Sequence, residues 1–150
     1  MDYKLLEKQL KSLFENETDM IANMANMSAF VFQEMKDINW AGFYIARENQ
    51  LVLGPFQGKV ACVRIPWGKG VCGSAAEKQE TILVENVHEF PGHIACDSAS
   101  NSELVIPVII NNKTFAIFDI DSPSLGRFTE EDKKGVETLV KVFENRTKLN

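Results

Sequence analysis

The chain has 150 residues, the length of a single domain, and its 45% hydrophobic and 25% charged residues are ordinary for a globular protein. This composition excludes disordered and collagen-like chains, and no run approaches the roughly 18 apolar residues that a membrane span needs. The net charge of −5, with no cluster of Lys and Arg, disfavours nucleic-acid binding. The chain has three cysteines, an odd number that neither closes a disulfide framework nor by itself forms a zinc set.

The chain start has no basic stretch followed by an apolar one, so we expect no signal or transit peptide and a cytoplasmic protein. Thiols are held reduced in that compartment. The cysteines would then be buried filler, metal ligands or redox groups, and filler is the default because a free Cys packs like a small hydrophobic residue.

Three helices are predicted from apolar residues at helical spacing. The second is expected to begin near Thr18, and the last near Thr129, where Asp132 suggests a capping-box variant. The second helix carries a methionine-rich stripe that we interpret as core. The expected apolar faces are Leu6, Leu10, Leu13 and Phe14; Ile21, Met24, Met27 or Ser28, Val31 and Met35; and Val136, Leu139, Val140 and Phe143.

Between these helices the sequence predicts six β-rich runs, with a short helix over 70–77 after a glycine-rich turn. Asn111 and Asn112 indicate a tight hairpin, because Asn tolerates positive φ. The expected architecture is α+β in one domain, 1–150: a mainly antiparallel sheet with the terminal helices on one face and loops roofing the other. The expected strands cover 39–46, 50–56, 59–65, 81–85, 103–110 and 113–121.

Alternation along two strands indicates a pocket. Asp119 and Asp121 share one face of the last strand, and Trp40 and Tyr44 share one face of the first. If Phe43 and Phe118 both face the helices, the two aromatic rings and the two carboxylates lie on the same side of the sheet. Such a side is a plausible site for a cationic ligand, although a solvated face is the plain alternative.

The cysteines are Cys62, Cys72 and Cys96, and no Cys-x-x-Cys occurs. His88 and His93 fit no known zinc spacing with Cys96, so we expect no metal site. Two contexts could favour a thiolate.

Cys72 lies at the expected start of a helix, where free amides and the helix dipole lower a thiol pKa. Cys96 lies in a loop of small and polar residues, 92–98, of the kind that is often functional. The neighbouring Asp97 alone would raise the pKa of Cys96, so formation of a Cys96 thiolate would need His93 or backbone donors. Three unrelated thiols stay an open alternative at this point.

Five segments in a fixed order resemble those of a GAF-domain family, the free methionine-(R)-sulfoxide reductases. They are GPFQGKVAC at 54–62, IPWGKGVCG at 65–73, FPGHIACD at 90–97, SELVIP at 102–107 and DIDSP at 119–123. The resemblance covers the chain from Asn39 to the final helix and includes all three cysteine positions. It implies a GAF fold used as an enzyme on free methionine-R-sulfoxide.

The resemblance also implies roles for individual residues. The position of Cys96 matches the nucleophile, and those of Cys62 and Cys72 match thiols that resolve the oxidised nucleophile. The positions that match the family's substrate pocket are Trp40, Tyr44, Glu103, Asp119 and Asp121.

These residue types suit that chemistry. A thiolate attacks the sulfoxide sulfur, and a carboxyl such as Glu103 or Asp121 supplies or relays the proton to the departing oxygen. The resulting sulfenic acid condenses with a second thiol, for which Cys62 is the first choice and Cys72 the second. Thioredoxin is the expected external reductant, and no bound cofactor is expected.

Two other functions compete with the reductase. One is a GAF sensor that binds a small ligand without catalysis, although three carboxylates on one wall would repel a phosphate ligand. The other is a zinc protein. The sequence does not define the oligomeric state, and a homodimer through the N-terminal helices is one expectation.

Overall fold

The fold is α+β, as predicted, and is built on one six-stranded antiparallel sheet of order β3-β2-β1-β6-β5-β4. The computed structural model describes residues 1–93 and 98–149. The helices are α1 (Tyr3–Leu13), α2 (Met20–Glu34), α3 (Gly70–Lys78) and α4 (Glu130–Arg146), with a 3-10 turn, η1, at Val87–Glu89. The strands are β1 (Trp40–Arg47), β2 (Gln50–Gly58), β3 (Arg64–Pro66), β4 (Ile82–Val84), β5 (Ser102–Ile110) and β6 (Lys113–Ser122).

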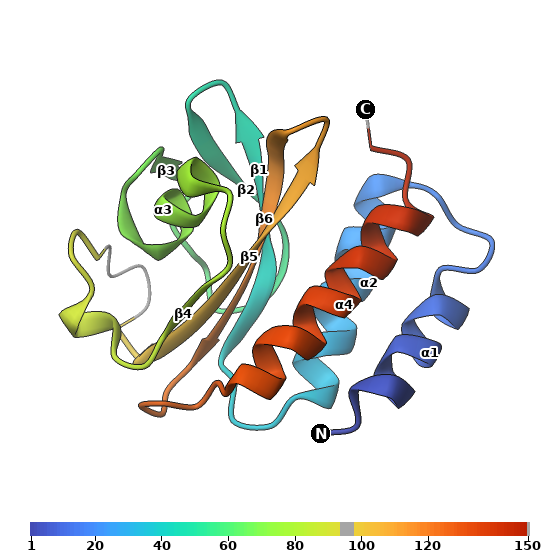
Figure 1. The fold of residues 1–150 in the computed structure, drawn as a ribbon, viewed down its shortest axis with the longest axis horizontal. Coiled ribbons are helices and arrows are strands. Elements are labelled where there is room, and N and C mark those ends of the chain that lie inside the picture. Colours follow the sequence, from blue (N-terminus) through green and yellow to red (C-terminus); the bar gives the residue numbers. More distant parts are fainter. Residues whose placement is uncertain (94–97, 150) are drawn as a thin grey trace.

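The sheet separates two hydrophobic clusters. Helices α2 and α4 cover one face, with α1 packed outside α4, and α3 covers the other (Figure 1). Phe43 of β1 and Phe118 of β6 are paired in register and lie buried in the helix-side cluster, as the alternation predicts. Trp40 and Tyr44 belong to the opposite cluster, beneath α3. The two faces of β1 therefore have different tasks: one closes the core and the other lines a pocket.

Helix α2 differs from its sequence prediction in two details. Asp19, not Thr18, caps it, because the Asp19 carboxylate accepts a hydrogen bond from the amide of Ala22 at 2.9 Å. Met24 and Met27 are fully buried, which confirms the methionine stripe as core. The prediction that Ile21 belongs to the buried face is wrong. Ile21 is the second residue of α2, lies off the packed stripe and is 54% exposed.

The predicted strand over 59–65 is also wrong in most of its length. Only its end forms β3, and residues 59–63 form a loop after Gly58, which has φ +132°. The side chains of Trp40 and Tyr44 donate hydrogen bonds to this loop, and the Leu53 amide of β2 donates to the Val63 carbonyl at 2.9 Å, but the loop does not extend β3. The hairpin at Asn111 and Asn112 is confirmed, with φ of 52° and 63°, the left-handed values of a type I′ turn.

The N-terminal helix is fixed to α4 by one polar cluster. The Tyr3 hydroxyl donates to Asp132 Oδ1 at 2.6 Å, and Arg127 pairs with Asp132 Oδ2 at 3.1 Å. Asp132 also completes the predicted capping box with Thr129. The Tyr3 ring lies directly on Gly135, where any Cβ would overlap it. Hydrogen bonds from Tyr3 and Thr129, together with the charge of Arg127, lower the pKa of Asp132 despite its burial.

We expect Tyr3→Phe to lower the free energy of unfolding by about 1 kcal/mol at neutral pH, because it removes a hydrogen bond to a charged acceptor. A carboxyl whose folded pKa is lowered stabilises the fold above its unfolded pKa and loses that contribution as pH falls through the folded pKa. The difference in the free energy of unfolding between the wild type and Tyr3→Phe should therefore shrink below about pH 4. Urea unfolding across pH measures it, and a difference that stays constant from pH 7 to pH 3 would contradict this role of Asp132.

Candidate active site

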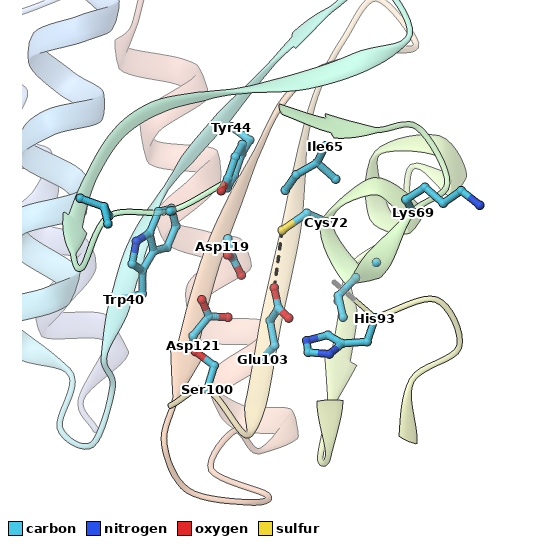
Figure 2. Close-up of a pocket in the computed structure, with 14 residues that line it drawn as sticks. Trp40, Tyr44, Ile65, Lys69, Cys72, His93, Ser100, Glu103, Asp119 and Asp121 are labelled. Atoms are coloured by element: carbon cyan, nitrogen blue, oxygen red, sulfur yellow. Dashed lines mark hydrogen bonds between the residues drawn. The ribbon is translucent and has the colours of Figure 1, made fainter. Parts of the chain in front are cut away.

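A pocket opens on the face of the sheet that α3 covers (Figure 2). Its space, with the open solvent at the mouth counted, is about 550 Å³. The sheet supplies an aromatic wall on β1 (Trp40 and Tyr44) and, beside it, an acidic wall on β5 and β6 (Glu103, Asp119 and Asp121). The 59–63 loop, β3 and α3 surround these walls. The residues that line it are Trp40, Tyr44, Val60, Ala61, Ile65, Lys69, Gly70, Val71, Cys72, His93, Ser100, Glu103, Asp119 and Asp121.

Strand register brings the predicted polar and aromatic residues together. Trp40 pairs with Asp121, and Asp121 pairs with Glu103, so these three form one row across β1, β6 and β5. Asp119 lies two residues before Asp121 on β6 and shares its face. Asp119 pairs with Gly42 of β1, and Tyr44 lies two residues after Gly42 on the same face of β1. All five predicted pocket residues thus line the same pocket, although this placement does not test their roles.

The aromatic wall also positions the loop that carries Cys62. Trp40 stacks between Tyr44 and Phe56, with ring centroids 5.9 and 5.1 Å apart. The Trp40 indole donates to the carbonyl of Lys59 at 3.1 Å, and the Tyr44 hydroxyl donates to the carbonyl of Cys62 at 2.8 Å. Aromatic stacking fixes the rings, and their polar ends then fix the loop.

The acidic wall crowds three carboxyl groups, and burial and crowding disfavour charge on Asp119. Asp119 is 5% exposed and Glu103 is 8% exposed. Burial, and after it the neighbouring carboxyls of Asp121 and Glu103, raise the pKa of Asp119 well above its usual range. The pocket therefore retains a proton on this wall, or binds a cation there.

Cys72 lies in the first turn of α3 and its thiol is buried and free. Its Sγ donates to Glu103 Oε2 at 3.5 Å. The expectation that the helix N-terminus would favour a thiolate here is wrong. Burial first, and then the charges of Asp119 and Glu103, raise the pKa of the Cys72 thiol well above its usual value and outweigh the helix dipole.

The other two cysteines are Cys62 and Cys96. Cys62 is partly buried in the 59–63 loop and is disulfide-bonded. Cys96, the predicted nucleophile, and Asp97 lie outside the described residues. Within the described part of the chain, His88 and His93 belong to no cluster of potential metal ligands; their rings contact each other, and His88 bonds to Asn101.

Sequence reasoning missed several residues that line the pocket. Lys69 precedes α3 and caps it without a side-chain hydrogen bond, and its side chain extends away from the acidic wall (Figure 2). Ser100, 8% exposed, accepts from the Asn39 side chain at 3.1 Å. Phe56 does not line the pocket but stacks on Trp40, which does. Lys69 stood within one of the quoted segments, whereas nothing in the sequence indicated Ser100.

Comparison with known proteins identifies the family. The GAF domain model matches residues 22–143. Free methionine-R-sulfoxide reductase of Escherichia coli (strain K12) is 50% identical over 142 residues, which cover 95% of this chain and 86% of the relative. Described helices include none long and apolar enough to cross a membrane.

Solved structures agree with this assignment. The reduced form of fRMsr of Staphylococcus aureus superposes with a TM-score of 0.94 at 49% identity, covering 97% of this chain and 94% of that one. A free methionine-R-sulfoxide reductase from Neisseria meningitidis, in complex with its substrate, superposes with a TM-score of 0.92 at 41% identity, covering 96% and 87%. The chain therefore has the GAF fold and belongs to the free methionine-R-sulfoxide reductase family of GAF-domain proteins.

Proposed function

We propose that this protein reduces free L-methionine (R)-S-oxide to methionine by thiol chemistry, with Cys96 as nucleophile and Cys62 as resolving thiol. The observation that carries the proposal is the pocket itself: the aromatic and acidic residues lie side by side on one face of the sheet, and the loop with the disulfide-bonded Cys62 is hydrogen-bonded to the aromatic ones. The family relationship supports the reductase activity. The mechanism and the roles of individual residues are what we infer from the pocket and the sequence.

The substrate fits the pocket by charge and shape. Carboxylates of the acidic wall can bind the substrate ammonium by charge-assisted hydrogen bonds. Trp40 offers its ring to the S-methyl group, since sulfur makes favourable contacts with aromatic rings. The N-terminus of α3, which has no side-chain cap, and the adjacent Lys69 are the groups that we expect to bind the substrate carboxylate. A pocket that binds both charged ends would refuse a methionine sulfoxide within a peptide.

The reaction proceeds in three balanced steps. The Cys96 thiolate attacks the sulfoxide sulfur and forms an S–S bond, while a carboxyl of the acidic wall protonates the oxygen. The oxygen then moves to the Cys96 sulfur as the S–S bond and the substrate S–O bond break. Methionine leaves reduced by two electrons, and Cys96 is oxidised to a sulfenic acid. The Cys62 thiol then displaces water from that sulfenic acid and forms a disulfide. An external dithiol, for which we propose thioredoxin, reduces the disulfide by exchange and becomes oxidised itself.

Cys72 is the second choice for the resolving thiol. Its buried, neutral thiol beside Glu103 is a poor nucleophile, because the thiolate is the reactive form. Cys62 is less buried and its backbone is held by Tyr44. These differences favour Cys62.

The alternative, a GAF domain that only binds a ligand, predicts a different result. A GAF sensor would bind a cyclic nucleotide in calorimetry and turn over no sulfoxide. The acidic wall disfavours a phosphate ligand, because Glu103, Asp119 and Asp121 all face the pocket.

Removal of each of the three thiols should have a different effect. Cys96→Ser should lower turnover of the free R-sulfoxide by about 10³-fold or more, because it removes the nucleophile. Cys62→Ser should still release one methionine per chain in a single turnover but stall before recycling. Cys72→Ser should lose less recycling than Cys62→Ser. A thioredoxin-coupled NADPH assay and rapid quenching measure these rates.

Circular dichroism should confirm that each thiol variant is folded. Full activity of folded Cys96→Ser would place the nucleophile elsewhere. The absence of turnover by the wild-type protein, with active coupling enzymes, would refute the proposed function.

The departing oxygen needs a proton, and we expect Glu103 to donate or relay it. Glu103→Gln keeps the size of the side chain but removes its acidity, so kcat/KM should fall by about 10²- to 10⁴-fold, the usual contribution of general acid catalysis. Glu85→Gln is the matched control, since Glu85 is exposed just beyond β4, the strand that pairs with β5. Equal activity of the two variants would exclude Glu103 as a proton donor or relay.

A further inference from the structure

The most concentrated group of potential metal ligands in the described residues is Cys72, Glu103 and Asp119. They come from α3, β5 and β6. One donor atom of each lies within 4.8 Å of the other two, and all three residues are buried. Such a set combines one soft sulfur with two hard oxygens.

A second observation concerns the Asp119 carboxyl of this group. Asp119 is 5% exposed, and its Oδ1 has no hydrogen-bond partner among the described residues. Its carboxyl points into the pocket beside Cys72 and Glu103 (Figure 2). A buried polar atom without a partner is costly and calls for an explanation.

The charges around the cluster agree with this observation. Within the described part of the chain, neither Glu103 nor Asp119 forms an ion pair with Lys or Arg. Lys69 is the one Lys or Arg that lines the pocket, and its side chain extends away from the acidic wall (Figure 2). A cation bound to the cluster would therefore meet little repulsion.

The distances suit a small, borderline-soft metal ion. Zinc forms bonds of roughly 2.3 Å to sulfur and 2.0–2.2 Å to carboxylate oxygen, which place those two ligands about 3.5 Å apart at the tetrahedral angle. The Sγ of Cys72 lies 3.5 Å from Oε2 of Glu103. The open mouth of the pocket leaves room for water as a further ligand.

We propose that Cys72, Glu103 and Asp119 form a binding site for a divalent transition-metal ion of the zinc class, and that the bound ion inhibits the protein by occupying the acidic wall. Binding converts the Cys72 thiol to a thiolate and releases its proton to solvent, with no redox change. Ion binding stands independently, whereas inhibition rests on the proposed reductase function. The ion is a competitor for the substrate rather than a resident cofactor, and cysteine spacing could not reveal it because the ligands come from three elements.

The test uses cobalt, which reports a metal–thiolate bond by near-ultraviolet charge-transfer absorption. The double variant Cys62→Ser/Cys96→Ser leaves Cys72 as the sole cysteine of the chain. We expect it to bind one Co²⁺ per chain with this absorption, and Zn²⁺ but not Mg²⁺ to displace the cobalt. Adding Cys72→Ser should abolish the absorption.

Asp119→Asn in the same background tests the carboxylate ligand. Asn has nearly the shape of a protonated Asp, and circular dichroism checks the fold. We expect Co²⁺ affinity to fall by about tenfold or more. Removal of a residue that only hydrogen-bonds to a metal ligand already costs about tenfold, and removal of a ligand itself should cost at least as much. Asp37→Asn is the matched control, because Asp37 is exposed at φ 58°, which Asn tolerates. Absence of the cobalt–thiolate absorption, or equal affinity of the two variants, would overturn the site.

The inhibitory part is tested on the wild-type enzyme. Zn²⁺ should raise the KM for free methionine-R-sulfoxide and leave kcat unchanged, and an unchanged KM would overturn inhibition by competition. The two proposals fail separately. Cobalt binding without any sulfoxide reduction would refute the reductase and keep the metal site, whereas reduction without cobalt binding would do the reverse.

Discussion

The crowding of three carboxyl groups on one wall of a buried pocket governs the chemistry of this protein. Antiparallel pairing places Glu103 opposite Asp121, and Asp119 is two residues along the same strand. Desolvation, and after it the neighbouring carboxyls of Asp121 and Glu103, raise the pKa of Asp119 well above its usual range. The wall must therefore keep a proton or take up a cation. A substrate that brings an ammonium group and needs a proton on its departing oxygen satisfies both requirements.

The same wall explains why the three cysteines are not equivalent. Cys72 faces the carboxyls and is held neutral, so its place at a helix N-terminus does not make it reactive. Cys62 lies outside the acidic wall, in a loop that Trp40 and Tyr44 hold by hydrogen bonds. The aromatic residues thus have two tasks in our account: they offer surfaces to the substrate and they fix the backbone of the resolving thiol. Substitution of either residue would disturb both tasks.

The α+β architecture and the shared face of the pocket residues follow from local patterns. Period-two alternation put Trp40 and Tyr44 on one face of β1 and the aspartates on one face of β6, and the pairing of Phe43 with Phe118 then aligned those faces. The family resemblance added Glu103 and the cysteine roles, which no spacing could supply. Three details were beyond local reasoning. The 59–63 loop is held by two side chains and one backbone hydrogen bond instead of a strand ladder, Ile21 lies off the packed stripe of its helix, and the thiol of Cys72 is governed by carboxyls distant in the sequence.

The central claim is that one thiol takes the oxygen of the substrate and a second thiol resolves it. Peptide mapping by mass spectrometry, after one equivalent of free methionine-R-sulfoxide is added to the fully reduced protein without an external reductant, tests it most directly. The account predicts one methionine per chain, a disulfide that joins Cys62 to Cys96, and Cys72 as a free thiol. Absence of methionine, or a disulfide that contains Cys72 in place of Cys62, would contradict it.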